Sequence, residues 1–272
     1  MSSASTHATA YGLALAVMLR APSTIAQPAA QQTDDWCQQD NWDRGREGVC
    51  EVRQFTVAAT SGVLSVGATN GGIEVVGQDR SDVFVLAKVV ATAENQPRAR
   101  QIADVVRVDA TSDRIAADGP RGLNRESWSV SYRVAVPRFL NVSVRTSNGG
   151  IRIQELESKI EFSTSNGGVK LVAVGGDVRG RTSNGGIDVD LEGPFWNGEG
   201  LDVETSNGGV RLAIPEGYSA RLEATTHNGG MNVNYPGAAH DRRSRDLNVQ
   251  LGSGGSPIRV RTSNGGINIR SK

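Results

Sequence analysis

One short phrase, Asn-Gly-Gly followed by an aliphatic residue, recurs along this chain of 272 residues. The seven copies begin at Asn70, Asn148, Asn166, Asn184, Asn207, Asn228 and Asn264. Self-similarity at a nearly fixed period predicts supersecondary units that stack on one another and share a continuous core. It also favours a protein that builds a surface over an enzyme.

Apolar and polar residues alternate on both sides of each Asn. In the first copy, Leu64 and Val66 precede the Asn by six and four residues, and Ile73 and Val75 follow it by three and five. Period-two alternation predicts half-buried strands before and after the corner. The position two residues before the Asn has the same inward parity in six copies, at Thr146, Thr164, Thr182, Thr205, Thr226 and Thr262.

The Asn-Gly-Gly corner has two interpretations. Asn-Gly between alternating strands is a strong hairpin signal. Alternatively, each corner turns one coil of a β-helix, so that like residues stack and the Asn side chains hydrogen-bond along a column. In either case we expect left-handed backbone conformations, which Asn tolerates and Gly adopts freely. The periodic spacing favours stacking, and we predict an all-β fold, a right-handed β-helix-like solenoid.

One short helix is expected in the N-terminal half, at residues 95–106. Asn95 can cap it, Pro97 suits its first turn, and an apolar face recurs with helical spacing at Ala99, Ile102, Ala103 and Val106. Strands are expected from near Phe55 and near 82–92, 106–110, 113–117 and 127–136.

The N-terminus predicts export. The apolar run from Tyr11 to Leu19 is too short to span a bilayer and is followed by Thr24-Ile25-Ala26, which fits a signal-peptidase site. Cys37 and Cys50 are the two cysteines, and in an exported chain they predict a disulfide worth about 3 kcal/mol. We therefore divide the chain into a signal peptide (1–26), a linker and Cys-bounded segment (27–53) and a repeat domain (54–272).

Residues that could carry chemistry are few. Basic and acidic side chains balance at 29 each, which leaves no electrostatic footprint for nucleic acid. No nucleophile elbow or phosphate-binding glycine loop is present, and we expect no metal and no cofactor. His227 occupies the corner slot that holds Ser in other copies, so we interpret it as a variant corner residue and not as a base.

Two acidic pairs and one aromatic pair keep alternatives open. Asp188 with Asp190, and Asp202 with Glu204, are each spaced by two on a strand and therefore share a face. If the coils bring the pairs together, they could serve a polysaccharide lyase or hydrolase, or a calcium site. The other interpretation is a solvated outer face. Phe195-Trp196 could contact a carbohydrate, or could tuck the 193–200 insertion onto the coil.

The repeated phrases resemble a bacterial family of repeat proteins classed as candidate adhesins, known as DUF4097 or toastrack domains. The resemblance rests on the serial Thr-Ser-Asn-Gly-Gly-Ile/Val phrases and on the preceding block of strand, helix at 95–106 and strands ending in Val134-Ala-Val-Pro137. It covers residues 53–270. It implies an envelope-facing or exported β-solenoid without known catalytic residues, in a family found beside envelope-stress sensing and surface-attachment systems.

Together these observations predict an exported, monomeric, non-catalytic module in the periplasm or on the surface of a bacterium, with no membrane span once the signal is removed. Its partner would be an envelope protein or a surface polymer, and not nucleic acid. The competing hypothesis is a β-helix carbohydrate-active enzyme that uses the acidic strand face. A third hypothesis is a structural spacer without a specific partner.

Overall fold

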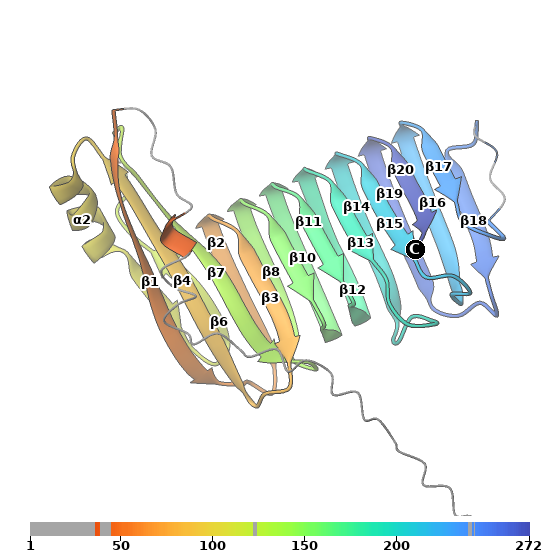
Figure 1. Cartoon of the computed structure of the whole chain (residues 1–272), viewed down its shortest axis with the longest axis horizontal. Helices are drawn as coiled ribbons and strands as arrows, with labels where there is room; N and C mark the ends of the chain where they lie inside the picture. The colour runs from red at the N-terminus through yellow and green to blue at the C-terminus, as the bar shows by residue number, and fades with distance from the viewer. Residues whose placement is uncertain (1–35, 39–44, 122–123, 239–240, 242) are drawn as a thin grey trace, which may run out of the picture.

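The computed structural model describes residues 36–38, 45–121, 124–238, 241 and 243–272. The predicted signal peptide (1–26) and the linker at 27–35 lie outside the described residues. The described residues form two ten-stranded sheets that face each other in one elongated array (Figure 1). An all-β fold built on long parallel sheets is therefore confirmed.

We call the two sheets A and B. Sheet A contains, in spatial order, β1 (Glu47–Ala58), β4 (Asp82–Ala93), β7 (Ser127–Pro137), β3 (Ile73–Gln78), β9 (Ile151–Gln154), β11 (Val169–Val172), β13 (Ile187–Asp190), β15 (Val210–Ile214), β20 (Ile267–Ser271) and β17 (Met231–Asn234). Sheet B contains β18 (Asp246–Leu251), β16 (Ala220–Asn228), β19 (Pro257–Asn264), β14 (Gly200–Asn207), β12 (Gly175–Asn184), β10 (Glu157–Asn166), β8 (Asn141–Asn148), β2 (Val63–Asn70), β6 (Arg114–Asp118) and β5 (Arg107–Ala110).

Each Asn-Gly-Gly corner carries the chain from sheet B to sheet A. β8 ends at Asn148 in sheet B, and β9 begins at Ile151 in sheet A, so the corner is not a hairpin. Parallel ladders pair equivalent positions of neighbouring coils, as in Asn166 with Asn184 and Ile160 with Val178. Like residues consequently stack on like along the array. We name each coil by its Asn.

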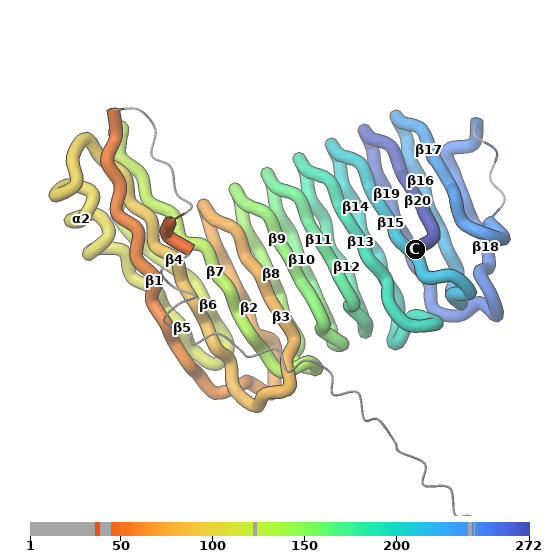
Figure 2. The backbone as a smooth tube through the Cα atoms, viewed as in Figure 1, coloured from red at the N-terminus to blue at the C-terminus, as the bar shows by residue number. Residues whose placement is uncertain are grey.

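The coils do not follow sequence order at the C-terminal end. Coil 264 lies between coils 207 and 228, because β19 pairs with β14 on one side and with β16 on the other. β20 likewise lies between β15 and β17. The last coil in the sequence is therefore inserted between two earlier ones, as its dark blue tube shows (Figure 2). β18 pairs antiparallel with β16 and closes this end of sheet B.

Backbone proximity, and not left-handed geometry, requires the first glycine of each phrase. Among the described residues, no repeat Asn has a positive φ, and Gly71 is the one repeat glycine with a left-handed φ, at 138°. The expectation of left-handed corners is therefore wrong. A methyl group on Gly167 would lie 2.0 Å from the carbonyl oxygen of Gly149 in the next coil, and equivalent clashes at 2.0–2.1 Å would occur at Gly71, Gly149, Gly185, Gly208, Gly229 and Gly265.

The predicted alternation is confirmed in the core. Inward side chains such as Val144 and Ile160 are fully buried, and they belong to one apolar cluster that runs between the sheets. The threonine column is buried as well, with exposed fractions between 0% and 6%. Each threonine hydroxyl donates to the carbonyl oxygen of the first glycine in a neighbouring coil, as Thr164 does to Gly149 at 3.0 Å. Burial of these hydroxyls therefore leaves no donor unpaired.

The N-terminal end is built differently. Helix α2 (Gln96–Val105) matches the predicted helix, with Asn95 Oδ1 accepting from the Arg98 N–H at 2.9 Å. Its buried face packs on β1 and β4 in a second small core with Val49, Ala91 and Ala93. β1 begins at Glu47, earlier than predicted, and crosses the expected boundary between residues 53 and 54. Residues 36–38 add a helical turn that the sequence did not indicate.

Candidate functional site

A groove runs along sheet A beside the corners. One section, of about 540 Å³, extends from Trp36 across coils 70, 148, 166 and 184. A second section, of about 680 Å³, continues over coils 207, 264 and 228 and shares Gly186 and Arg211 with the first. Its floor is the second glycine of each phrase: Gly72, Gly150, Gly168, Gly186, Gly209, Gly266 and Gly230. We call this feature the glycine groove.

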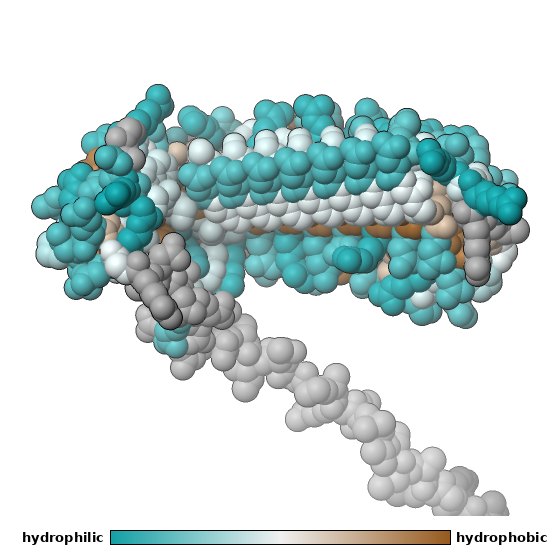
Figure 3. Space-filling model, turned by 90° about the horizontal axis from the view of Figure 1, so that it is seen from above, coloured by the Kyte–Doolittle hydropathy of each residue, from teal (hydrophilic) through white to brown (hydrophobic). Residues whose placement is uncertain are grey.

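An asparagine ladder runs along the corners, two residues before the glycines of the groove floor. Each Asn Nδ2 donates to the Oδ1 of the Asn in the neighbouring coil, at 2.8–3.0 Å, from Asn228 at one end to Asn70 at the other. These residues are exposed. Asn184 Nδ2 also donates to the Ser165 carbonyl oxygen at 3.3 Å. Seen from above, hydrophilic and pale stripes run unbroken along the array (Figure 3).

Charged side chains form a rim of the glycine groove. Five of them occupy the outward position four residues after the Asn: Glu74, Arg152, Lys170, Asp188 and Arg211. Arg133 extends the row on β7, where it pairs with Glu74. Glu74 lies 3.5 Å from Arg133 and 3.7 Å from Arg152, and Asp188 lies 3.1 Å from Arg211. Lys170 has no ion-pair partner within the described part of the chain. Four cations against two carboxylates give this rim a net charge of +2.

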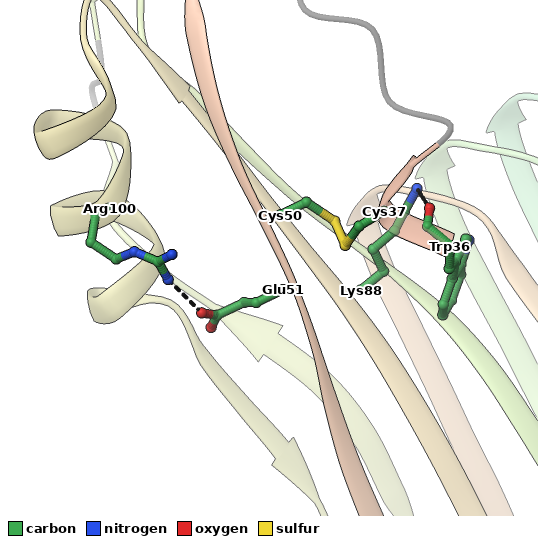
Figure 4. The surroundings of a disulfide bond; sticks show 6 residues. All are labelled: Trp36, Cys37, Cys50, Glu51, Lys88 and Arg100. Carbon is green, nitrogen blue, oxygen red and sulfur yellow. Dashed lines mark hydrogen bonds and ion pairs between the residues drawn. A yellow bond between two sulfur atoms is a disulfide. The ribbon is translucent and has the colours of Figure 1, made fainter. Parts of the chain in front are cut away.

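Trp36 closes one end of the glycine groove. The Arg133 guanidinium lies 4.1 Å from the centroid of its ring, a cation–π contact, and Lys88 Nζ donates to its carbonyl oxygen at 3.4 Å. A disulfide joins the adjacent Cys37 to Cys50 on β1, with 5.7 Å between the Cα atoms (Figure 4). The predicted cysteine pair is thus bonded in the structure and tethers Trp36 to the groove.

The two acidic pairs singled out by the sequence do not converge. Asp188 and Asp190 lie on β13 in sheet A, whereas Asp202 and Glu204 lie on β14 in sheet B. Their outward side chains therefore occupy opposite faces of the molecule. Each pair is also engaged by cations. Asp190 contacts Lys272, and Arg261 lies 2.7 Å from Asp202 and 3.9 Å from Glu204. The idea of one four-carboxylate face is wrong.

The aromatic insertion divides its two residues between core and solvent. Trp196 is 4% exposed, and its Nε1 donates to the Gly176 carbonyl oxygen at 3.0 Å, so it tucks the insertion onto the coil. Phe195 is 57% exposed. His227 lies exposed at its corner, and the Arg245 guanidinium donates to its carbonyl oxygen at 2.5 Å.

Buried titratable side chains offer little for proton transfer. Burial raises the pKa of both Tyr132 and Tyr218 well above the ordinary tyrosine value, so neither ionises near neutral pH. Within the described residues, no group of three or more His, Cys, Asp or Glu side chains could hold a metal ion. Over the same residues, no helix combines the length and the apolar character that crossing a bilayer requires.

Sequence reasoning missed the glycine groove because it treated both glycines as turn formers. The signal was available in the repeats: a second glycine in all seven copies, with an outward charged or polar residue two positions later. The position of Trp36 at the end of the groove could not be predicted from the sequence, because the disulfide places it there and the repeat pattern does not include it.

Comparison with known proteins places the chain in a family. No curated protein matches it. Solved structures with similarity include a candidate cell adhesion protein from Clostridium sporogenes (14% identity, TM-score 0.41, 83% of this chain and 100% of that one). Others are a candidate adhesin from Bacteroides fragilis (11%, 0.35, 82% and 97%) and a candidate lipid binding protein from Parabacteroides distasonis (13%, 0.34, 81% and 96%). The toastrack DUF4097 family model matches residues 50–270, and the chain therefore belongs to this family.

Proposed function

We propose that this protein is an exported, non-catalytic module of the bacterial cell envelope, in the periplasm or on the cell surface, that binds a partner through the glycine groove. The observation that carries the proposal is the groove itself, whose two adjoining sections place a row of second glycines along seven coils. A right-handed, monomeric solenoid with its signal peptide at 1–26, linker at 27–53 and repeat domain at 54–272 completes the proposal. Its role would be adhesin-like or associated with envelope stress.

Several features support export and binding over catalysis. The apolar run after Tyr11 is typical of a signal peptide, and a disulfide suits an oxidising compartment. The carboxylates that an enzyme would need lie on opposite sheets and are paired with Arg211, Lys272 and Arg261. An elongated surface with repeated polar groups suits an extended partner better than a small substrate.

Site-specific photocrosslinking in native cells tests this function. A photoreactive residue replaces Lys170 on the groove rim, and a matched variant carries it at Lys159 on the outer face of sheet B. We expect one reproducible product, protein or polymer, from the first position and none from the second. Mass spectrometry of the mature chain would show whether processing follows Ala26. Equal labelling at both positions, or none at either, would favour the spacer hypothesis, and an unprocessed chain retained in the cytoplasm would contradict export.

A further inference from the structure

The second glycine of each phrase is not required by the fold in the way that the first is. A methyl group on Gly168 would lie 3.6 Å from the nearest atom, the carbonyl oxygen of Gly186, which is an ordinary contact. A methyl group on Gly230 would meet nothing within 4 Å. Neither residue has a left-handed φ. At the other five copies the contact is tighter: a methyl group would lie 3.1–3.4 Å from the carbonyl oxygen of a second glycine in a neighbouring coil, at Gly72, Gly150, Gly186, Gly209 and Gly266. Glycine therefore eases the packing of these coils, and in all seven copies it leaves an open groove floor with accessible backbone.

That floor carries a row of unpaired N–H donors. The carbonyl oxygens of the second glycines accept ladder bonds, as Gly168 does from the Ile151 N–H at 3.0 Å. Across the described residues, no hydrogen bond is made by the N–H groups of Gly150, Gly168, Gly186, Gly209, Gly266 and Gly230. Because the coils are spaced like parallel strands, these donors repeat about every 4.8 Å along the groove.

The peptide geometry points these donors along the groove floor, toward the preceding coil. The Gly150 N–H belongs to the peptide whose carbonyl, on Gly149, accepts from the buried Thr164 hydroxyl at 3.0 Å. In a trans peptide the N–H and the C=O point in opposite directions. The Gly149 carbonyl oxygen faces coil 166, where a methyl group on Gly167 would lie 2.0 Å from it, so the Gly150 N–H faces the opposite way, toward coil 70. An acceptor lying in the groove would reach this N–H between the two coils. The same arrangement recurs wherever a threonine of the inward column bonds the first glycine.

One coil shows what kind of atom can accept a hydrogen bond from this row. At the end of the array, the Gly72 N–H donates to Ser131 Oγ, on the neighbouring strand β7, at 3.2 Å. The serine hydroxyl oxygen thus occupies, within the protein, the place that an external acceptor would take on the other coils. The Gly72 N–H is the first donor of the row, and its hydrogen bond to Ser131 leaves it paired.

We propose that the glycine groove binds a linear acidic polysaccharide, lying along the array, whose oxygens accept from this N–H row. This inference rests on the proposed function and names its ligand class. Successive glycosidic oxygens of an extended pyranose chain are separated by about the length of one sugar ring, which is close to the spacing of about 4.8 Å between neighbouring N–H donors. A peptide strand presents carbonyls to one side at roughly 6.6 Å intervals and falls out of step. Carboxylates on the glycan would meet the rim of net charge +2, at Lys170 above all.

Binding by groove variants is the first test. The probe is an oligomannuronate long enough to span the row, titrated against the full mature chain by calorimetry. We expect Gly168→Ala to weaken binding about tenfold, because its methyl group covers the donor row. Gly67→Ala is the matched control, since that glycine lies on sheet B with nothing within 4 Å of an added methyl group. Lys170→Gln should weaken binding a few-fold and reduce its salt dependence, whereas Lys159→Gln should change neither.

Amide NMR identifies the donors directly. On adding the probe, we expect the N–H signals of Gly150, Gly168 and Gly186 to shift, and that of Gly72 to stay, because Ser131 already accepts from it. In Ser131→Ala, Gly72 should join the responding signals. A folded protein whose shifts lie on sheet B, or whose glycine signals do not move, would overturn the inference. So would equal binding of poly-glutamate or of a neutral dextran.

Failure of this inference and failure of the proposed function give different results. If crosslinking at Lys170 captures a protein in the envelope while oligomannuronate does not bind, the groove has a partner and the acidic glycan is wrong. If the glycan binds through the N–H row but the protein is not exported, the site stands and the envelope role is wrong.

Discussion

The two ends of the array are closed by different devices. At the N-terminal end, β4 runs antiparallel to both of its neighbours, β1 and β7, and helix α2 covers β1 and β4. At the C-terminal end, a coil of ordinary repeat sequence is inserted out of order, and the single strand β18 follows. The first device uses residues that differ from the repeats. The second uses a repeat itself, so the sequence of a coil determines its shape but not its place in the stack.

The largest effect should come from removing the inserted coil. Deleting residues 257–272 takes away β19 and β20, which are the strands that join coil 207 to coil 228. We expect residues 216–256 to unfold while coils 70 to 184 stay folded, because each coil contacts mainly its neighbours. Hydrogen exchange read by mass spectrometry measures this. Full protection of β16 in the shortened chain would mean that coil 228 can dock directly on coil 207.

A buried charge in the regular part of the array should come next. Val144 is fully buried on β8, so Val144→Asp introduces an unpaired carboxylate into the core and should lower the free energy of unfolding by several kcal/mol. Arg145, the next residue, is exposed, and Arg145→Asp should stay within about 0.5 kcal/mol of the parent. Urea denaturation compares the two, and similar losses would contradict the strand register.

The two glycines of one corner should differ in how much their substitution by alanine lowers stability. Gly167→Ala places a methyl group 2.0 Å from the Gly149 carbonyl oxygen, so the coils must part, at a cost of about 3 kcal/mol or more. Gly168→Ala meets only an ordinary contact at 3.6 Å and should be close to neutral. Thermal unfolding of both variants distinguishes them. A strongly destabilised Gly168→Ala would show that the second glycine is structural, and the argument for an open groove floor would lose its basis.

Much of this fold follows from the repeats, for a physical reason. Alternation around the Asn fixes which side chains face inward, as Ile160 and Val178 do, and a shared register follows because a slip of one residue would expose the whole inward set. The order of the coils in the stack cannot be predicted from the repeats, because Leu222 and Ile258 present equivalent apolar faces to any neighbour. The separation of Asp188 from Asp202 was available in principle, since the first follows its Asn and the second precedes its own.

The disulfide tests how far the stability of the N-terminal end is independent of the rest of the array. Replacing Cys37 and Cys50 by Ser should lower stability by up to about 3 kcal/mol, and should release Trp36 from its contact with Arg133. Tryptophan fluorescence quenching should increase, while exchange protection in coils 166 to 228 should be unchanged. A uniform loss of protection along the whole array would show that the disulfide stabilises more than the end that it joins.

The smallest effect concerns an ion pair that joins the inserted coil to its outer neighbour. The Arg259 side chain on β19 donates to Glu223 on β16 at 2.7 Å, and this hydrogen bond lowers the pKa of the Glu223 carboxyl. Since the folded-state pKa is depressed, the pair contributes stability at neutral pH and loses it as the pH falls through that pKa. The pair is partly exposed, so its contribution should be below about 1 kcal/mol. A double-mutant cycle of Glu223→Gln and Arg259→Gln should therefore give a small coupling at pH 7 that is lost in acid, once the pH has fallen through the depressed pKa of Glu223. Coupling that persists in acid would show that the carboxylate charge does not hold coil 228 on coil 264, which would leave the apolar faces and the asparagine ladder to do so.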